Sequence, residues 1–185
     1  MYTIRRLTAE ELPGAARSLG ELLVDAVDGG ASLGFLAPLD VSAASVWWQA
    51  LAPELTAGRL VVWVALAGDG RVAGAVQLAP ARPANARHRA ELAKLMVHRA
   101  DRGRRVATYL LAAAELNAAD LGIRLLVLDA ESGGPAERLY ESAGWSRAGV
   151  IPDHATDPSG VPHATTIYFK RVAPRPTADG TASPG

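Results

Sequence analysis

The stretch LMVHRADRGRRVATYLLAAAELNAADL, residues 95–121, decides how the rest of the chain is interpreted. It begins with strand-like apolar residues, Leu95 to Val97, passes through a basic turn that contains Gly103, and continues as an alanine- and leucine-rich helix from Val106. A strand that turns sharply into a helix directs several unpaired backbone N–H groups at one point, beside the positive end of the helix dipole. That geometry suits a phosphate.

Three arginines support a phosphate site at this turn. Arg102, Arg104 and Arg105 surround it, and a guanidinium can pair with a diphosphate in bidentate fashion. A basic surface turn followed by an amphipathic helix accounts for this stretch equally well when it is taken by itself. The remainder of the chain has to decide between the two interpretations.

Length and charge limit the classes of protein that the chain can belong to. Its 185 residues fit one domain with a substantial core, which we expect at residues 1–172. Residues 173–185 have nothing apolar to bury, so they are expected to form a disordered tail. Basic and acidic residues number 19 each, so the net charge gives no argument for nucleic acid or an anionic membrane as partner.

Cysteine usage and the start of the chain give further limits. No cysteine is present, which excludes disulfides, thiol nucleophiles and thiolate metal sites. The four histidines have no metal-ligand spacing among them, so no metal is expected. Met1 leads directly into a strand-like segment, and no apolar run has the length of a membrane span. We therefore expect a soluble, cytoplasmic protein.

Hydrophobic periodicity and turn residues predict an α/β (α+β) fold with a mixed, mostly antiparallel sheet of about seven strands flanked by helices. The expected strands cover 2–7, 60–67, 72–78, 88–97, 123–129, 145–151 and 165–172, and the expected helices 8–27, 42–55, 106–121 and 135–143. A whole helix separates strands 88–97 and 123–129, so these two strands should be parallel.

Two segments are candidate walls of a ligand pocket. Residues 28–41, which include Phe35, are too rich in glycine and proline for a helix and too apolar for a free linker. Trp47 and Trp48 are adjacent in the next helix, so only one can face the core squarely and the other is available to a ligand. Residues 152–163 are expected to form a polar loop before the last strand.

With this order of elements the chain resembles the GCN5-related N-acetyltransferases, the GNAT family, over roughly residues 2–172. The family's loop pattern is (Arg or Gln)-x-x-Gly-x-(Gly or Ala). It is matched by Arg102-Gly103-Arg104-Arg105-Val106-Ala107, in which Arg105 stands at the usual glycine position.

A second family segment, Asn-x-x-Ala-x-x-(Leu or Phe)-Tyr-x-x-x-Gly-(Phe or Trp), follows one strand later. It is matched by Gly133, Ala136, Leu139, Tyr140, Gly144 and Trp145, with Gly133 in place of the asparagine. The resemblance implies a GNAT fold whose sheet is splayed at its centre, with acetyl-CoA as acyl donor. The implied cofactor-binding residues are Met96, Val97, Arg102, Gly103, Arg104, Arg105, Val106, Ala107, Gly133 and Ala136.

Acetyl transfer from a thioester to an amine needs a donor to the developing oxyanion and a proton for the departing thiolate. Tyr140 suits the second role because a phenol, with a pKa of about 10, and an alkyl thiol, with about 8.5, exchange a proton almost evenly. The resemblance also places the family's usual acid at Tyr140. The alternative is that Tyr140 only packs against a helix end. The resemblance implies the backbone N–H near Val97 as oxyanion donor.

Two carboxylates are candidates for the catalytic base. Glu91 lies on strand 88–97, and strand alternation puts it on an apolar face together with Leu95 and Val97, where a carboxylate can act through a bound water. The alternative is an exposed residue paired with a neighbouring arginine. By the same alternation Lys94 falls on the opposite face and is expected to be structural. His98 is expected to hydrogen-bond locally.

Asp129 is the other candidate base, or an anchor for a cationic substrate, since it ends the next strand. A strand-end carboxylate that caps a turn is an equally good account. The final hairpin resembles a small-molecule branch that includes tabtoxin resistance protein, which implies a small amine acceptor such as an amino-acid-like antibiotic or metabolite. Asp153, His154 and Asp157 would then line or cover the pocket, and the candidate substrate-binding residues are Phe35, Trp47, Asp129 and His154.

Three hypotheses of function remain open from the sequence. The first is direct acetyl transfer to a small-molecule amine, and the second is transfer to a protein N-terminus or lysine. The third is an acyl-CoA-binding module without catalysis, suggested by the departures at Arg105 and Gly133. A monomer and a homodimer are both compatible with the pattern.

Overall fold

A computed structural model of the chain describes residues 1–173, so the predicted tail lies, from residue 174 onward, outside the described residues. The strands are β1 Thr3–Leu7, β2 Val61–Leu66, β3 Val72–Pro80, β4 Arg89–Val97, β5 Leu125–Glu131, β6 Ser146–Thr156 and β7 Pro162–Arg171. The helices are α1 Leu12–Asp28, α2 Val41–Gln49, α3 Ala52–Thr56, α4 Val106–Asp120 and α5 Pro135–Ser142, with short 3-10 turns at Ala84–Ala86 and Arg99–Asp101. Within residues 1–173, no helix combines the length and apolarity that crossing a bilayer requires.

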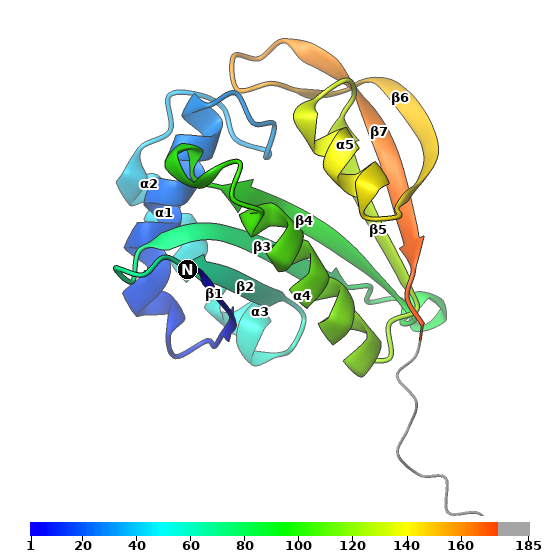
Figure 1. Cartoon of the computed structure of the whole chain (residues 1–185), viewed down its shortest axis with the longest axis horizontal. Coiled ribbons are helices and arrows are strands. Elements are labelled where there is room, and N and C mark those ends of the chain that lie inside the picture. Colours follow the sequence, from blue (N-terminus) through cyan, green and yellow to red (C-terminus); the bar gives the residue numbers. More distant parts are fainter. Residues whose placement is uncertain (174–185) are drawn as a thin grey trace, which may run out of the picture.

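The strands form one seven-stranded sheet in the order β1-β2-β3-β4-β5-β7-β6, which confirms the expected fold class (Figure 1). β4 and β5 are parallel and joined through α4, as the crossover argument predicted, and the other pairs described are antiparallel. The parallel pairing joins only Arg89–Glu91 to Leu125–Val127. Beyond it the two strands diverge, as Figure 1 shows, and this divergence is the splayed centre expected for the sheet.

Helices cover both faces of the sheet and create two apolar cores. α4 and α5 pack on one face, where Leu110, Leu126 and Tyr168 are fully buried. α1 and α2 pack on the other face, over β1 to β3, where Trp48 is fully buried. On that second face α1 also contacts β4, and the candidate site lies beside it along β4 and β5.

Gly74 on β3 allows α4 to approach the sheet closely. A Cβ at this position would lie 2.8 Å from the Met96 carbonyl oxygen and 2.9 Å from Leu110 Cδ1, both shorter than van der Waals contact. The absence of a side chain therefore allows the first turns of α4 to lie directly over β3 and β4. The loop that leads into α4 is therefore also held close to the end of β4.

Two predicted boundaries were wrong. The helix expected at 42–55 is interrupted after Gln49 and resumes as α3, which has Pro53 in its first turn, where proline is tolerated. The loop expected at 152–163 is mostly strand, since β6 continues to Thr156 and β7 begins at Pro162. Pro152 is accommodated because β6 is the edge strand and its pairing shifts register between Ile151 and Ala155.

Candidate active site

The gap between β4 and β5 exposes backbone groups of β4. The His98 N–H donates to the Ala73 carbonyl on β3 at 2.9 Å. Because N–H groups of a strand alternate in direction, the preceding Val97 N–H faces away from β3 and into the gap beside β5. Arg102 Nε donates to the Val97 carbonyl at 3.4 Å, which places that carbonyl on the gap side as well. The strand edge can thus pair with an extended ligand arm and direct an N–H at a carbonyl oxygen there.

The loop from Arg102 to Arg105 delivers the N-terminus of α4 to the same end of the gap. Gly103 and Arg105 have left-handed φ values of 75° and 63°, and Arg105 is the N-cap residue without a side-chain cap bond. The first backbone N–H groups of a helix have no partner within the helix and carry its positive dipole end. All three arginines of the loop are exposed, whereas Val106 is buried in the α4 core.

Asp101, which directly precedes this loop, ties it to the β2–β3 hairpin and to the start of the chain. Its side chain is buried, accepts a hydrogen bond from the Tyr2 hydroxyl at 2.8 Å, and pairs with Arg71 Nη2 at 2.8 Å. Burial raises the pKa of Asp101, but the hydrogen bonds from Tyr2 and Arg71 outweigh it and leave the pKa below its usual value. The anchor joins the chain start, the β2–β3 hairpin and the loop, and sequence motifs alone did not reveal it.

Arg105 occupies the usual glycine position of the loop in a conformation that glycine adopts without strain. A left-handed residue with a side chain costs about 1 kcal/mol. We therefore expect Arg105→Gly to raise the melting temperature by about 2–4 °C. Thermal unfolding followed by circular dichroism measures the change. Arg104→Gly is the matched control, since Arg104 has an ordinary negative φ; an equal rise in both variants would show that charge, not backbone strain, is responsible.

Gly133 has a φ of 77°, and its N–H donates to Glu137 Oε2 at 2.8 Å. Asparagine and glycine are the residues that adopt left-handed backbone most readily, which explains the exchange of one for the other at this position. Ala136 is half-buried and packs on the α4 core. The two residues lie between the end of β5 and the first turn of α5.

Tyr140 lies on α5 with its ring packed against Trp145 and Tyr168, at centroid distances of 5.9 and 5.8 Å. The side chain is 6% exposed. Burial, and then the negative charge of Asp129, raises the pKa of Tyr140 well above its ordinary value. Within residues 1–173 no hydrogen bond engages its hydroxyl, so the phenol is protonated and its proton is available. Tyr140 is therefore a core residue whose hydroxyl can also donate a proton near Asp129.

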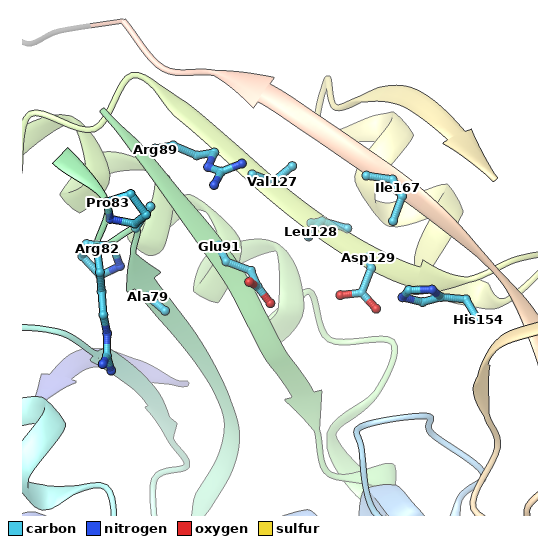
Figure 2. A pocket seen from close by; sticks show the side chains of 12 residues that line it. Ala79, Arg82, Pro83, Arg89, Glu91, Val127, Leu128, Asp129, His154 and Ile167 are labelled. Carbon is cyan, nitrogen blue, oxygen red and sulfur yellow. The ribbon is translucent and has the colours of Figure 1, made fainter. Parts of the chain in front are cut away.

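A groove of about 590 Å³ opens on the sheet face opposite α4, a size suited to a small ligand (Figure 2). Glu91 on β4 and Asp129 on β5 both point into it, and His154 approaches Asp129 from β6. Arg82 and Arg89 line the groove near the start of β4, so both signs of charge are present. Asp129 lies past Val127, the last residue of β5 that pairs with β4, at the point where the gap opens.

A bulge in β4 overturns the assignment of strand faces beyond Glu91. Pairing with β3 runs from Gln77↔Ala93 to Ala75↔Met96, so β4 has one extra residue, and Lys94 takes a φ of 53°. Leu95 and Val97 consequently pack with the α4 core rather than on the face of Glu91. Glu91 itself is exposed, not enclosed by an apolar face as predicted. A β-bulge of this kind changes the direction in which the side chains after it point.

The prediction that Lys94 lies away from Glu91 was wrong. Burial lowers the pKa of Lys94, while the negative charges of Asp129 and Glu91 raise it only in part, so these two groove carboxylates are its charged neighbours. Its Nζ lies 6.0 Å from the centroid of the Phe35 ring. The sequence signal was a single lysine in an otherwise apolar run, but that signal does not predict the bulge that turns the side chain toward the groove.

The segment between α1 and α2 is tied to the β6–β7 hairpin. The Ala37 N–H donates to the Pro158 carbonyl at 2.8 Å, and Ser32 Oγ donates to the Thr156 carbonyl at 2.9 Å. We call these two hydrogen bonds the clasp. Phe35 packs edge-on against Trp47 at 5.1 Å, so Trp47 supports this segment and does not line the groove. The clasp therefore holds the segment between α1 and α2 against the end of the β6–β7 hairpin.

Two of the histidines, His98 and His163, make local hydrogen bonds. His98 Nδ1 accepts from the Ala100 N–H at 3.2 Å, as expected of a residue that hydrogen-bonds locally. His163 contacts Asp157, which also accepts from Ser159 and Val161, and these hydrogen bonds lower the pKa of Asp157 to about 2. Asp157 therefore shapes the hairpin turn rather than the groove. Within the described part of the chain, no cluster of three or more histidine, aspartate or glutamate side chains could hold a metal ion.

Comparison with known proteins adds a family match and a set of similar folds. The model of a family described as the Acetyltransferase (GNAT) family matches residues 35–145. Ribosomal-protein-alanine N-acetyltransferase from Brucella melitensis is 25% identical, with a TM-score of 0.74 and coverage of 91% of this chain and 99% of that one. Phosphinothricin acetyltransferase from Sinorhizobium meliloti, solved with acetyl-CoA, is 18% identical, with a TM-score of 0.75 and coverage of 96% and 94%. An N-acetyltransferase from Staphylococcus aureus has 18% identity, a TM-score of 0.75 and coverage of 94% and 99%.

Proposed function

The chain belongs to the GNAT family of acetyltransferases, and from this premise we propose that it transfers the acetyl group of acetyl-CoA directly to a primary amine on a small molecule. Acetyl-CoA dependence is the family property. The observation that carries the proposed reaction is the juxtaposition at the gap: Tyr140 approaches from one face of the sheet, and Asp129, in the groove, from the other.

We assign the diphosphate of the cofactor to the α4 loop and its extended arm to the free edge of β4. The arginines and helix N-terminus supply positive charge, and the strand edge supplies backbone hydrogen bonds. In this arrangement the thioester lies at the gap, where the Val97 N–H can donate to its carbonyl oxygen. A donor placed in advance at a developing oxyanion is among the largest contributions to acyl transfer.

Asp129 is our preferred base, with Glu91 as a second carboxylate in the groove. Asp129 lies where β4 and β5 have separated, whereas Glu91 lies within the paired region, further from the opening. The negative charge of Asp129 also acts on Tyr140 on the far side of the sheet. Asp129 would take the amine proton directly or through water, and Tyr140 would protonate the thiolate as the carbon–sulfur bond breaks.

A small acceptor is favoured by the size of the groove, about 590 Å³, which suits a small ligand better than an extended peptide. The fold shared with a phosphinothricin acetyltransferase and the groove volume agree with an acceptor of amino-acid size. We also propose that the chain belongs to the small-molecule branch that includes tabtoxin resistance protein.

Transfer to a protein N-terminus is the second candidate, because the Brucella relative acts on ribosomal-protein alanine by its name. One assay separates the candidates: release of free thiol from acetyl-CoA by the purified protein with small amines, amino acids, aminoglycosides and short peptides. Release that depends on a small amine supports the proposal, and release with peptides alone selects the second candidate. Acetyl-CoA binding by calorimetry without release with any acceptor would contradict both and indicate a binding module.

A further inference from the structure

Lys94 is a cation near the groove that has no ion-pair partner among residues 1–173. The chain has two lysines, Lys94 and Lys170. Lys170 donates to Glu115 Oε2 and to the Ala143 carbonyl, each at 2.7 Å. No such contact in the described part of the chain involves Lys94, although its side chain is largely shielded from water. A shielded ammonium without a direct partner is costly unless a ligand supplies one.

The position of Lys94 is held by an unusual backbone. The extra residue of the β4 bulge puts Lys94 at a φ of 53°, which is rare for a residue with a side chain. Such strain of about 1–3 kcal/mol persists mainly where the surrounding structure enforces it, often at functional sites. The segment between α1 and α2 passes beside the ammonium, since a Cβ at Gly34 would lie in ordinary van der Waals contact with Lys94 Nζ, at 3.9 Å. The β4 bulge and the left-handed backbone of Lys94 therefore place its ammonium beside the segment between α1 and α2.

The charges around the gap are therefore arranged as two opposite poles. Asp129 and Glu91 supply negative charge in the groove, and Lys94 supplies positive charge beside it under Phe35. An acceptor with only an amine would gain from the carboxylates and be opposed by Lys94. An acceptor that carries an anionic group near its amine would satisfy both poles at once.

We propose that Lys94 is a specificity-determining residue that selects acceptors bearing an anionic group, such as a carboxylate, close to the amine that is acetylated. The inference rests on the proposed function, and it adds the chemical class of the acceptor. Lys94 holds the anion by a charge-assisted hydrogen bond, while Asp129 and Glu91 receive the amine. The ammonium of Lys94 carries the recognition, and no covalent step involves it.

Matched acceptors test the proposal. The thiol-release assay compares kcat/KM for an α-amino acid with kcat/KM for its carboxamide, in the wild type and in Lys94→Met. We expect the preference for the carboxylate to fall about 10- to 100-fold in the variant, the range of one hydrogen bond to a charged group. Comparing the same two acceptors in both proteins cancels the difference in basicity of their amines.

Two further variants show whether the preference depends on Lys94 itself. Lys94→Arg should retain the preference for the carboxylate, because it retains the charge. Arg89→Met removes a second cation that lines the groove, and because Arg89 is exposed the fold should tolerate the change. Loss of the preference in Arg89→Met but not in Lys94→Met would overturn the proposal, and so would equal kcat/KM for both acceptors in the wild type.

A second measurement does not depend on turnover. Reductive methylation with ¹³C-formaldehyde labels the two lysines and the N-terminus, so the titration of each lysine can be followed by NMR. Addition of the amino acid should raise the pKa of Lys94, which faces Glu91 from β4 and Asp129 from β5, and leave Lys170 unchanged. If no acceptor releases thiol, the proposed function fails, and this titration alone decides the inference: an unshifted Lys94 signal contradicts it.

Discussion

Tyr140→Phe should lower kcat by about 10²- to 10⁴-fold while acetyl-CoA binding stays nearly unchanged. The variant removes only the hydroxyl, so the ring contacts with Trp145 and Tyr168 remain and the fold should be preserved. Without the phenol, the thiolate has to leave unprotonated or take its proton from water. Thiol release gives kcat, calorimetry gives the dissociation constant of acetyl-CoA, and the melting temperature checks the fold.

Tyr168→Phe is the matched control for this result. Tyr168 neighbours Tyr140, but its hydroxyl donates to Glu137 and Glu141, and burial raises its pKa to about 12. The proton of this hydroxyl is therefore already engaged. Its loss should leave kcat close to the wild-type value. The raised pKa of Tyr140 keeps the acid form present beyond its ordinary range, so Tyr140 should cause no alkaline decline of kcat below pH of about 10. A Tyr140→Phe variant with full rate at every pH would exclude Tyr140 as the acid.

Asp129→Asn should lower kcat/KM by about 10²- to 10⁴-fold, and more than Glu91→Gln does. The amide keeps the shape of the side chain but can neither accept the amine proton nor attract a cationic acceptor. Both carboxylates line the groove, but Asp129 lies where the strands have separated. Steady-state kinetics of the two variants with one acceptor identify which carboxylate is the base.

The pH dependence distinguishes a base from an anchor in the same pair of variants. If Asp129 is the base, Asp129→Asn should recover at high pH, where the free amine no longer needs to lose a proton to the protein. If Asp129 only attracts the acceptor, the loss should appear mainly in KM. A larger loss in Glu91→Gln than in Asp129→Asn would reverse our assignment.

The order of elements and the loop from Arg102 to Arg105 could be predicted because they depend on residues that are close together in the sequence. Strand, basic turn and helix from Leu95 to Leu121 fix the parallel crossover, since a chain that passes through a whole helix returns in the same direction. The core positions of Val106 and Leu110 follow from the same helical period. These features need no information about distant parts of the chain.

The predictions that failed concern contacts between distant segments. The bulge at Lys94 reflects how β4 pairs with β3, and nothing in Ala93–Lys94–Leu95 indicates an extra residue. Pro152 suggested a loop, but an edge strand with a shifted register accepts it. The clasp joins residues more than a hundred positions apart, so the apolar character of residues 28–41 did not reveal that this segment binds the β6–β7 hairpin.

The separation of β4 and β5 beyond their three paired residues leaves an opening in the sheet. In the proposed reaction, the donor at the loop before α4 and the acceptor in the groove would reach this opening from opposite faces of the sheet. Neither would have to pass through the space that the other occupies. Both molecules could therefore be bound together, as the proposed direct transfer requires, and the deacetylated cofactor could leave before the acetylated amine.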